Sequence, residues 1–262
     1  MQVLSKNNKV LLADGQAVKW QSGNDIPLKV LTRNNKLLLA DGKALRNLKL
    51  PTTYTELPYL VATDDSKAWI DLGIPYQYGC RVEYKITLKG AANIFGVFYT
   101  TQRCRGIVGS DSASFNVGTS SSTTVYPKIE GLTTDTVYTI TNQANPDIPN
   151  AAIVVDDRQQ VLTVQTDWLT WDSSPQNLYL FAVNRTNTAT SAQGIRIIHY
   201  FKYYDVDGNL LLDLIPVERK SDGVLGMLNK VNGRFLTNIS TGTFYKEVPA
   251  SADEEIDDME IV

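Results

Sequence analysis

The alternation of apolar and polar positions predicts a chain built mainly of short β-strands. Residues 81–88 alternate strictly, which is the period-2 pattern of a strand with one buried face. Other strands are predicted, from alternation or from apolar runs between turn residues, at 94–100, 114–117, 135–141, 152–155, 160–166, 178–184, 194–204 and 210–217. Many short strands with frequent turn signals favour a two-sheet antiparallel sandwich.

The turn residues refine this pattern near the end of the chain. Asp207-Gly208 is typical of a hairpin turn, because glycine readily adopts a positive φ. Pro216 is predicted to end the strand that returns from this turn, since proline has no amide hydrogen to donate. Residues 223–229 are the one stretch that could hold a helical turn.

An internal repeat precedes the sandwich. Residues 3–18 return as residues 30–45, with eleven of sixteen positions identical. Each copy predicts three short strands joined by an Asn-Asn turn and an Asp-Gly turn. A unit this small cannot bury its own apolar face, so it needs a partner surface. We therefore divide the chain into two tandem β-hairpin repeats (1–50), a sandwich (51–248) and an acidic tail (249–262).

Composition and charge exclude several classes of protein. The net charge is only −3, and the last stretch carries six acidic residues, so nothing favours nucleic-acid binding. No run of about 18 apolar residues predicts a membrane span, and the start lacks the apolar core of a signal peptide. Cys80 and Cys104 form no CxxC pair, and two reduced thiols are favoured over a disulfide. No cofactor is expected.

The closing part of the sequence resembles a known family. It reads GIRIIHYFKYYD from Gly194, GNLLLDLIPV from Gly208, KSDGVLGM from Lys220, and then VNGRF and TGTF. This series resembles the closing half of concanavalin- or LamG-like jelly rolls in virion proteins of tailed phages and prophages of gut bacteria. Residues 68–75 look like the opening strand of the same family. The resemblance implies a jelly-roll β-sandwich and a virion role, and the repeats resemble anchoring segments of such fibre proteins.

Residues that could carry catalysis fail on spacing. A retaining glycosidase needs two carboxyl groups about 5–5.5 Å apart, but the glutamates before the tail are isolated in sequence. Asp205 and Asp207 belong to the turn that contains Gly208, and the position of this glycine does not match an EF-hand loop. Because LamG-like domains sometimes hold calcium at the sandwich rim, a weak calcium site here stays an open alternative. His199, the single histidine, lies in an apolar strand and is expected to be a packed or surface strand residue rather than part of a catalytic triad. We expect neither catalytic nor metal-binding residues.

The remaining candidates are binding residues. Trp168 and Trp171 could stack on a host glycan or pack in an interface. The proposed anchoring residues of the repeats are Leu11, Leu12, Trp20, Leu38 and Leu39. We therefore expect a non-enzymatic virion structural protein, displayed as a homo-oligomeric head fibre or capsid decoration and docked to other virion proteins through residues 1–50. The alternative is a tail fibre, or adhesin for host attachment, or a carbohydrate-binding module for host surface glycans.

Overall fold

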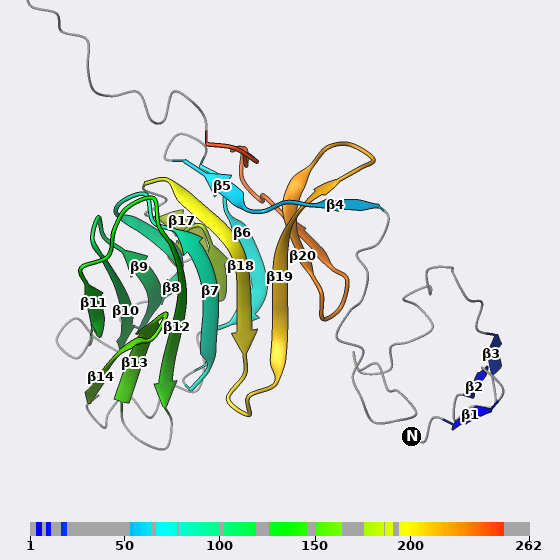
Figure 1. The fold of residues 1–262 in the computed structure, drawn as a ribbon, viewed down its shortest axis with the longest axis horizontal. Coiled ribbons are helices and arrows are strands. Elements are labelled where there is room, and N and C mark those ends of the chain that lie inside the picture. The colour runs from blue at the N-terminus through cyan, green and yellow to red at the C-terminus, as the bar shows by residue number, and fades with distance from the viewer. Residues whose placement is uncertain are drawn as a thin grey trace, which may run out of the picture.

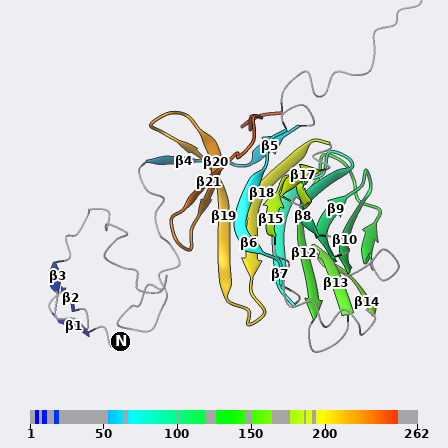
Figure 2. The same ribbon diagram turned by 180° about the vertical axis from the view of Figure 1, so that it is seen from behind.

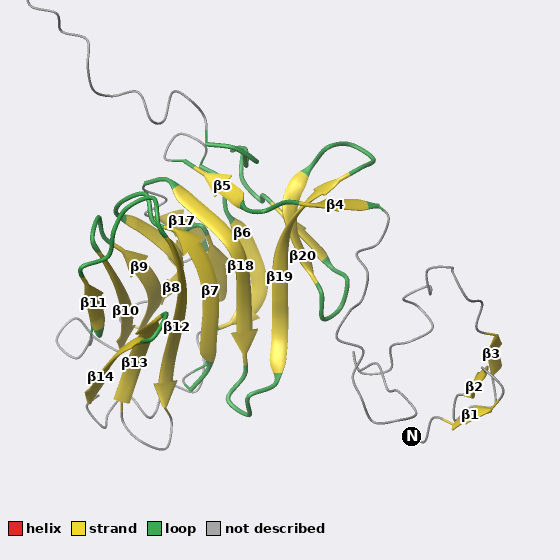
Figure 3. Cartoon of the chain, in the orientation of Figure 1, coloured by secondary structure: helices red, strands yellow, loops and turns green. Residues whose placement is uncertain are grey.

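In the computed structural model, every regular element of the described residues is a β-strand (Figure 3). None of the described residues belongs to a helix that could cross a membrane. The structure describes residues 4–6, 9–11, 17–19, 53–63, 67–77, 79–99, 102–118, 126–145, 150–163, 176–185, 187–190 and 194–248.

The larger sheet has ten strands in the order β14-β13-β12-β7-β18-β19-β20-β21, with β5 beside β18 and β4 beside β19. Every pair in it is antiparallel. Its strands are β4 (Tyr54–Glu56), β5 (Leu60–Ala62), β7 (Arg81–Thr87), β12 (Val137–Asn145), β13 (Asn150–Val155), β14 (Arg158–Thr163), β18 (Arg196–Tyr204), β19 (Leu210–Arg219), β20 (Leu225–Asn229) and β21 (Phe235–Thr237).

The second sheet has eight strands and lies behind the first (Figures 1 and 2). Its order is β11-β10-β9-β8-β15-β6, with β16 beside β8 and β17 beside β16. All of its pairs are antiparallel except the parallel pair of β16 with β8. Its strands are β6 (Ile70–Pro75), β8 (Ala92–Tyr99), β9 (Gln102–Val108), β10 (Ser112–Gly118), β11 (Lys128–Glu130), β15 (Asn177–Leu180), β16 (Val183–Arg185) and β17 (Thr188–Thr190).

Aromatic rings from both sheets meet at the centre of the sandwich. Tyr84 of β7, Phe95 of β8 and Phe201 of β18 are buried, with ring centroids 5.5–6.4 Å apart. Gly106 of β9 makes room for them, because a Cβ there would lie 2.8 Å from the Tyr84 hydroxyl oxygen. Aromatic pairs add to the free energy gained from burial alone. The structure thus confirms the predicted class, an all-β antiparallel sandwich.

The first repeat forms a small sheet of its own. Its strands are β1 (Leu4–Lys6), β2 (Lys9–Leu11) and β3 (Ala17–Lys19), paired antiparallel in chain order. This agrees with the three strands predicted for each copy. The second copy and residues 249–262 lie outside the described residues, and the division at 50 and 248 stays a prediction.

Two predictions near the end of the chain are wrong. Residues 223–229 contain no helical turn but strand β20, which pairs with β19 and β21. Pro216 does not end β19, which continues to Arg219. The reason is that pairing with β18 stops at Leu214 and pairing with β4 starts at Val217. Pairing with β20 continues through Pro216 on the other side, and the Pro216 carbonyl accepts a hydrogen bond from the Leu57 amide at 2.9 Å. The strand therefore loses only the one bond that the missing amide hydrogen would donate.

The prediction of a single strand at 178–184 is also wrong, because the structure has two strands there, β15 and β16. Phe181 separates them with a φ of 69°, in the left-handed region that non-glycine residues seldom adopt. The chain reverses there, so β15 runs antiparallel and β16 parallel to the same strand, β8. The burial of Phe181 against Phe244, with ring centroids 4.9 Å apart, holds this conformation.

Candidate functional site

Half-buried polar and aromatic side chains gather on the outer surface of β7 and β18. Residues of β7 alternate between the core and this surface, and cross-strand partners share a face. Lys202 is opposite Glu83 and Tyr204 is opposite Arg81, and Tyr200 lies on the same face. We call these five residues, Arg81, Glu83, Tyr200, Lys202 and Tyr204, the tyrosine face.

Contacts within the tyrosine face link every member to a neighbour. The Glu83 carboxylate accepts hydrogen bonds from Lys202 Nζ at 2.9 Å and from the Tyr200 hydroxyl at 3.1 Å. The Arg81 guanidinium lies 3.9 Å from the centre of the Tyr204 ring, and Lys202 Nζ lies 4.8 Å from that of Tyr200. These cation–π contacts fix the orientation of both rings.

Burial and charge shift the titration of this surface. Desolvation, followed by the negative charge of Glu83, raises the pKa of Tyr200. Desolvation lowers the pKa of Lys202, but the hydrogen bond to Glu83 and the charge interactions with Glu83 and the neighbouring tyrosines together outweigh it, and the net pKa shift is upwards. At neutral pH the Tyr200 phenol is therefore neutral and lies beside a charged Lys202.

The chemistry of this arrangement is suited to a polar ligand with flat apolar patches. Tyr200 and Tyr204 are four residues apart on an extended strand, about 13 Å along it. On the neighbouring strand β12, Thr139, Thr141 and Gln143 occupy the same face and offer hydroxyl and amide groups. Stacking rings beside hydrogen-bonding groups are what a short oligosaccharide requires.

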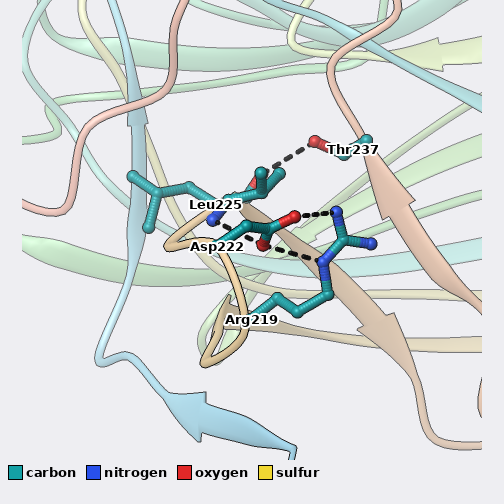
Figure 4. Close-up of polar contacts among 5 residues, drawn as sticks. Arg219, Asp222, Leu225 and Thr237 are labelled. Carbon is teal, nitrogen blue, oxygen red and sulfur yellow. Dashed lines mark hydrogen bonds and ion pairs between the residues drawn. The ribbon is translucent and has the colours of Figure 1, made fainter.

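Figure 4 shows how the closing segment of the sandwich uses its charged residues. Arg219 donates two hydrogen bonds to the Asp222 carboxylate, at 2.9 and 2.6 Å, across the tight turn between β19 and β20. Asp222 also accepts from the Val224 amide, and the Thr237 hydroxyl donates to the Leu225 carbonyl at 2.9 Å. These groups build the turn and join β20 to β21.

Two asparagines of the same segment have the same kind of role. Asn229, 1% exposed, accepts from the amides of Asp213 and Val231. Asn238 accepts from the amide of Trp69 and so joins the end of β21 to the start of β6. The polar side chains of this segment therefore hold the sandwich together.

The residues considered for catalysis also have structural contacts. Asp205 accepts hydrogen bonds from the amides of Asp207 and Asn209 in the hairpin turn. Desolvation raises its pKa, but the hydrogen bonds from the Asn209 side-chain amide and from these two backbone amides together outweigh it, and the net pKa shift is downwards. Three of the described glutamates, Glu83, Glu130 and Glu218, each pair with a lysine. Within the described ranges, no three His, Cys, Asp or Glu side chains are close enough to hold a metal ion.

His199 and the cysteines are packed into the structure. His199 Nδ1 lies 2.9 Å from the Pro58 carbonyl oxygen and Nε2 lies 2.9 Å from the Thr87 hydroxyl. Cys80 and Cys104 are buried and free, which confirms the prediction of reduced thiols. Burial raises the pKa of both, and a protonated thiol is a poor nucleophile.

The binding residues proposed from sequence fall outside what the structure describes. This holds for Trp168, Trp171, Leu12, Trp20, Leu38 and Leu39, while Leu11 lies in β2. Sequence reasoning missed the tyrosine face. The sequence signal for this face is the alternation of Tyr200, Lys202 and Tyr204. The sequence does not reveal that this strand pairs with β7, which supplies Arg81 and Glu83.

Comparisons with known proteins do not assign a function to this chain. No family model and no curated protein matches this chain. Domains LG4-5 of the mouse laminin alpha1 chain match with 15% identity and a TM-score of 0.43, over 67% of this chain and 48% of theirs. The Ruminococcus gnavus IT-sialidase CBM40, bound to alpha2,3 sialyllactose, matches with 10% identity and a TM-score of 0.44, over 61% and 92%. A SAP-like pentraxin from Limulus polyphemus matches with 10% identity and a TM-score of 0.38, over 57% and 70%. Because these TM-scores are below 0.5, the fold class rests on this chain's own sheets.

Proposed function

We propose that this chain is a non-enzymatic structural protein of a tailed-phage virion, displayed on the particle as a head fibre or capsid decoration. The supporting observation is that the segment resembling virion jelly rolls, residues 194–245, supplies β18 to β21, and its turn residues Arg219, Asp222, Asn229 and Asn238 bond within the fold. Polar side chains that bond within the fold have a structural role, which supports a structural protein rather than an enzyme. In this proposal residues 1–50 dock the homo-oligomer to other virion proteins.

Particles from the bacterium that encodes the chain test this role. Purified virions are analysed by mass spectrometry and labelled with a gold-conjugated antibody against the sandwich. We expect the chain in the particles and the label on the head. Label at the tail tip would favour a tail fibre or adhesin instead, and absence from washed particles would overturn the virion role. Replacing Leu11, Leu12, Leu38 and Leu39 by serine is expected to abolish incorporation, because docking buries apolar surface.

A second function, recognition of a host surface glycan, is favoured by the tyrosine face. Two oriented tyrosine rings about 13 Å apart along β18 can stack on sugar units of one oligosaccharide. Arg81, Lys202 and Glu83 then bond its hydroxyl groups. Loss of one stacking ring weakens such a contact by about 1 kcal/mol, the middle of the range that aromatic contacts contribute.

Glycan arrays followed by calorimetry test this second function. We expect the chain to bind at least one glycan of the host surface, and Tyr204→Ala to weaken that binding about fivefold or more. Tyr126→Ala is the matched control, because Tyr126 is an exposed tyrosine (44%) outside the tyrosine face. Equal weakening in both variants, or no glycan bound, would remove the glycan function without affecting the virion proposal.

A further inference from the structure

The guanidinium of Arg81 is held on the tyrosine face without an acidic partner. Arg81 is half-buried, and its guanidinium lies 3.9 Å from the centre of the Tyr204 ring. Among the described residues, Arg81 takes part in no ion pair, and its side chain forms no hydrogen bond. A guanidinium has five N–H donors that point in fixed directions. These donors are therefore available to a ligand.

Two other arginines show what this side chain does when it has a structural role. Arg158 donates to the Glu130 carbonyl at 2.9 Å and so joins β14 to β11. Arg219 donates twice to the Asp222 carboxylate and so closes the turn between β19 and β20. Arg81 makes no contact of either kind, so the hydrogen bonds of the fold do not account for its guanidinium.

The charges around Arg81 balance one another. Glu83 accepts a hydrogen bond from Lys202, and Asp213 of β19 is opposite Lys202 in the register of the sheet. Lys85 lies two residues after Glu83 on the same face of β7. These two acids and two lysines sum to zero. Arg81 therefore adds one positive charge to this part of the surface, which favours an anionic ligand group.

Arg81 also lies in a row of uncharged residues. The row crosses the five neighbouring strands β14, β13, β12, β7 and β18 (Figure 1). In register order it consists of Val161, Ala152, Gln143, Arg81 and Tyr204. Val161 and Gln143 are exposed, and Ala152 is half-buried. Five strands span four spacings, roughly 19 Å, which is long enough for several sugar units with one cation among neutral neighbours.

We propose that Arg81 binds the carboxylate of an acidic sugar, so that the glycan recognised by the tyrosine face contains hexuronic acid. The inference rests on the glycan function proposed above and narrows its ligand class. A guanidinium matches a carboxylate with two parallel hydrogen bonds. The carboxylate of a hexuronic acid is attached directly to the sugar ring. A ring beside Tyr204 can therefore reach Arg81 on the next strand, about 4.8 Å away.

Oligosaccharides that differ only in the carboxyl group test this inference. Trimers of galacturonic acid and of glucuronic acid are compared by calorimetry with their carboxyl-reduced forms, in which each carboxylate is replaced by a hydroxymethyl group. We expect at least one acidic trimer to bind about tenfold or more tightly than its reduced form. If glycans bind but no acidic trimer binds better than its reduced form, the inference is overturned and the glycan function stands. If no glycan binds at all, both are overturned.

Two variants test whether Arg81 is the source of the preference. Arg81→Gln removes the charge, and we expect the ratio of acidic to neutral affinity to fall to within about twofold of one. Arg81→Lys keeps the charge but loses the planar fork that binds a carboxylate twice, and we expect it to lose most of the preference. An unchanged ratio in either variant would overturn the proposal. Urea titration checks that each variant folds, and the oligosaccharide pairs test the native chain without any variant.

Matched controls separate this contact from general attraction of anions. Arg185 also lies over an aromatic ring, that of Phe98 at 5.0 Å, but on the other sheet. Arg185→Gln removes the same charge and is expected to leave the affinity ratio unchanged. Lys85→Gln removes a charge from the same face of β7 and is expected to change the ratio less than about twofold. If either control lost as much of the preference as Arg81→Gln, the attraction would be unspecific and the proposal would be overturned.

Discussion

Tyr203 and Tyr204 are neighbours on β18, yet their side chains meet different surroundings. Tyr203 is 1% exposed, and its hydroxyl lies 2.7 Å from Cys80 Sγ and 3.2 Å from the Pro75 carbonyl oxygen. Tyr204 lies on the outer surface, with its ring beneath Arg81. Because successive residues of a strand face opposite sides, one position along the chain separates a core residue from a candidate ligand contact. The inner face of β7 and β18 thus stabilises the fold, and the outer face is free to vary in function.

The largest effect is expected at the inner face, from Phe201→Ala. This change removes a ring that packs on both Tyr84 and Phe95, and truncation of a buried phenylalanine lowers the free energy of unfolding by about 3–5 kcal/mol. Urea titration followed by intrinsic fluorescence measures it. Tyr200→Ala, the adjacent change on the outer face, serves as control and is expected to cost far less. Equal losses would contradict the division between the two faces.

A smaller difference is expected between two changes that each remove one hydroxyl. Tyr203→Phe leaves the Gln77 amide and the Pro75 carbonyl without this partner, which lowers the free energy of unfolding by about 1–3 kcal/mol. Tyr204→Phe alters the outer face only, and surface changes of this size stay within about 0.5 kcal/mol. The same urea titration compares them. A destabilised Tyr204→Phe with an unaffected Tyr203→Phe would reverse the assignment of the faces.

His199 should make stability depend on pH. The Pro58 carbonyl can only accept, so Nδ1 carries the proton and Nε2 accepts from Thr87. Desolvation lowers the pKa of His199, the charge of Lys85 adds to this, and the bond to Pro58 opposes it, with a net downward pKa shift. The unfolded chain, with a histidine pKa of about 6.5, therefore binds the proton first as pH falls.

The contribution of His199 to the free energy of unfolding is therefore fully present above about pH 6.5. It is lost as the pH falls from there towards the lower pKa of the folded state. Urea titrations across this pH window measure how the free energy of unfolding changes with pH. We expect it to fall with falling pH in the native chain, and the part of this slope due to histidine to be absent in His199→Gln. Glutamine keeps a side-chain amide near Pro58 and Thr87, so it separates titration from packing. An unchanged slope in this variant would assign the pH dependence to other groups.

How far the sequence predicted the molecule depended on whether a feature is local. The alternation at 81–88 correctly predicted β7, and the Asp207-Gly208 turn was also correct, because each signal lies within a few residues. Pro216 was misjudged because its tolerance depends on which strands lie beside β19. The tyrosine face was missed for the same reason, since Glu83 and Lys202 are 119 residues apart and meet only through sheet register.

The smallest effect is expected from the ion pair on the outer face itself. The Lys202 and Glu83 side chains are 29% and 20% exposed, so water screens their attraction only in part. A double-mutant cycle with Lys202→Met and Glu83→Gln is expected to give a coupling free energy of about 0.2–1 kcal/mol, falling with added salt. The Lys128–Glu130 pair is the control, because its side chains are 45% and 70% exposed at a similar distance of 2.7 Å. If the control pair coupled more strongly, the tyrosine face would not be the preorganised surface that its contacts indicate, because preorganisation requires Glu83 to hold Lys202 and Tyr200 in place before a ligand arrives.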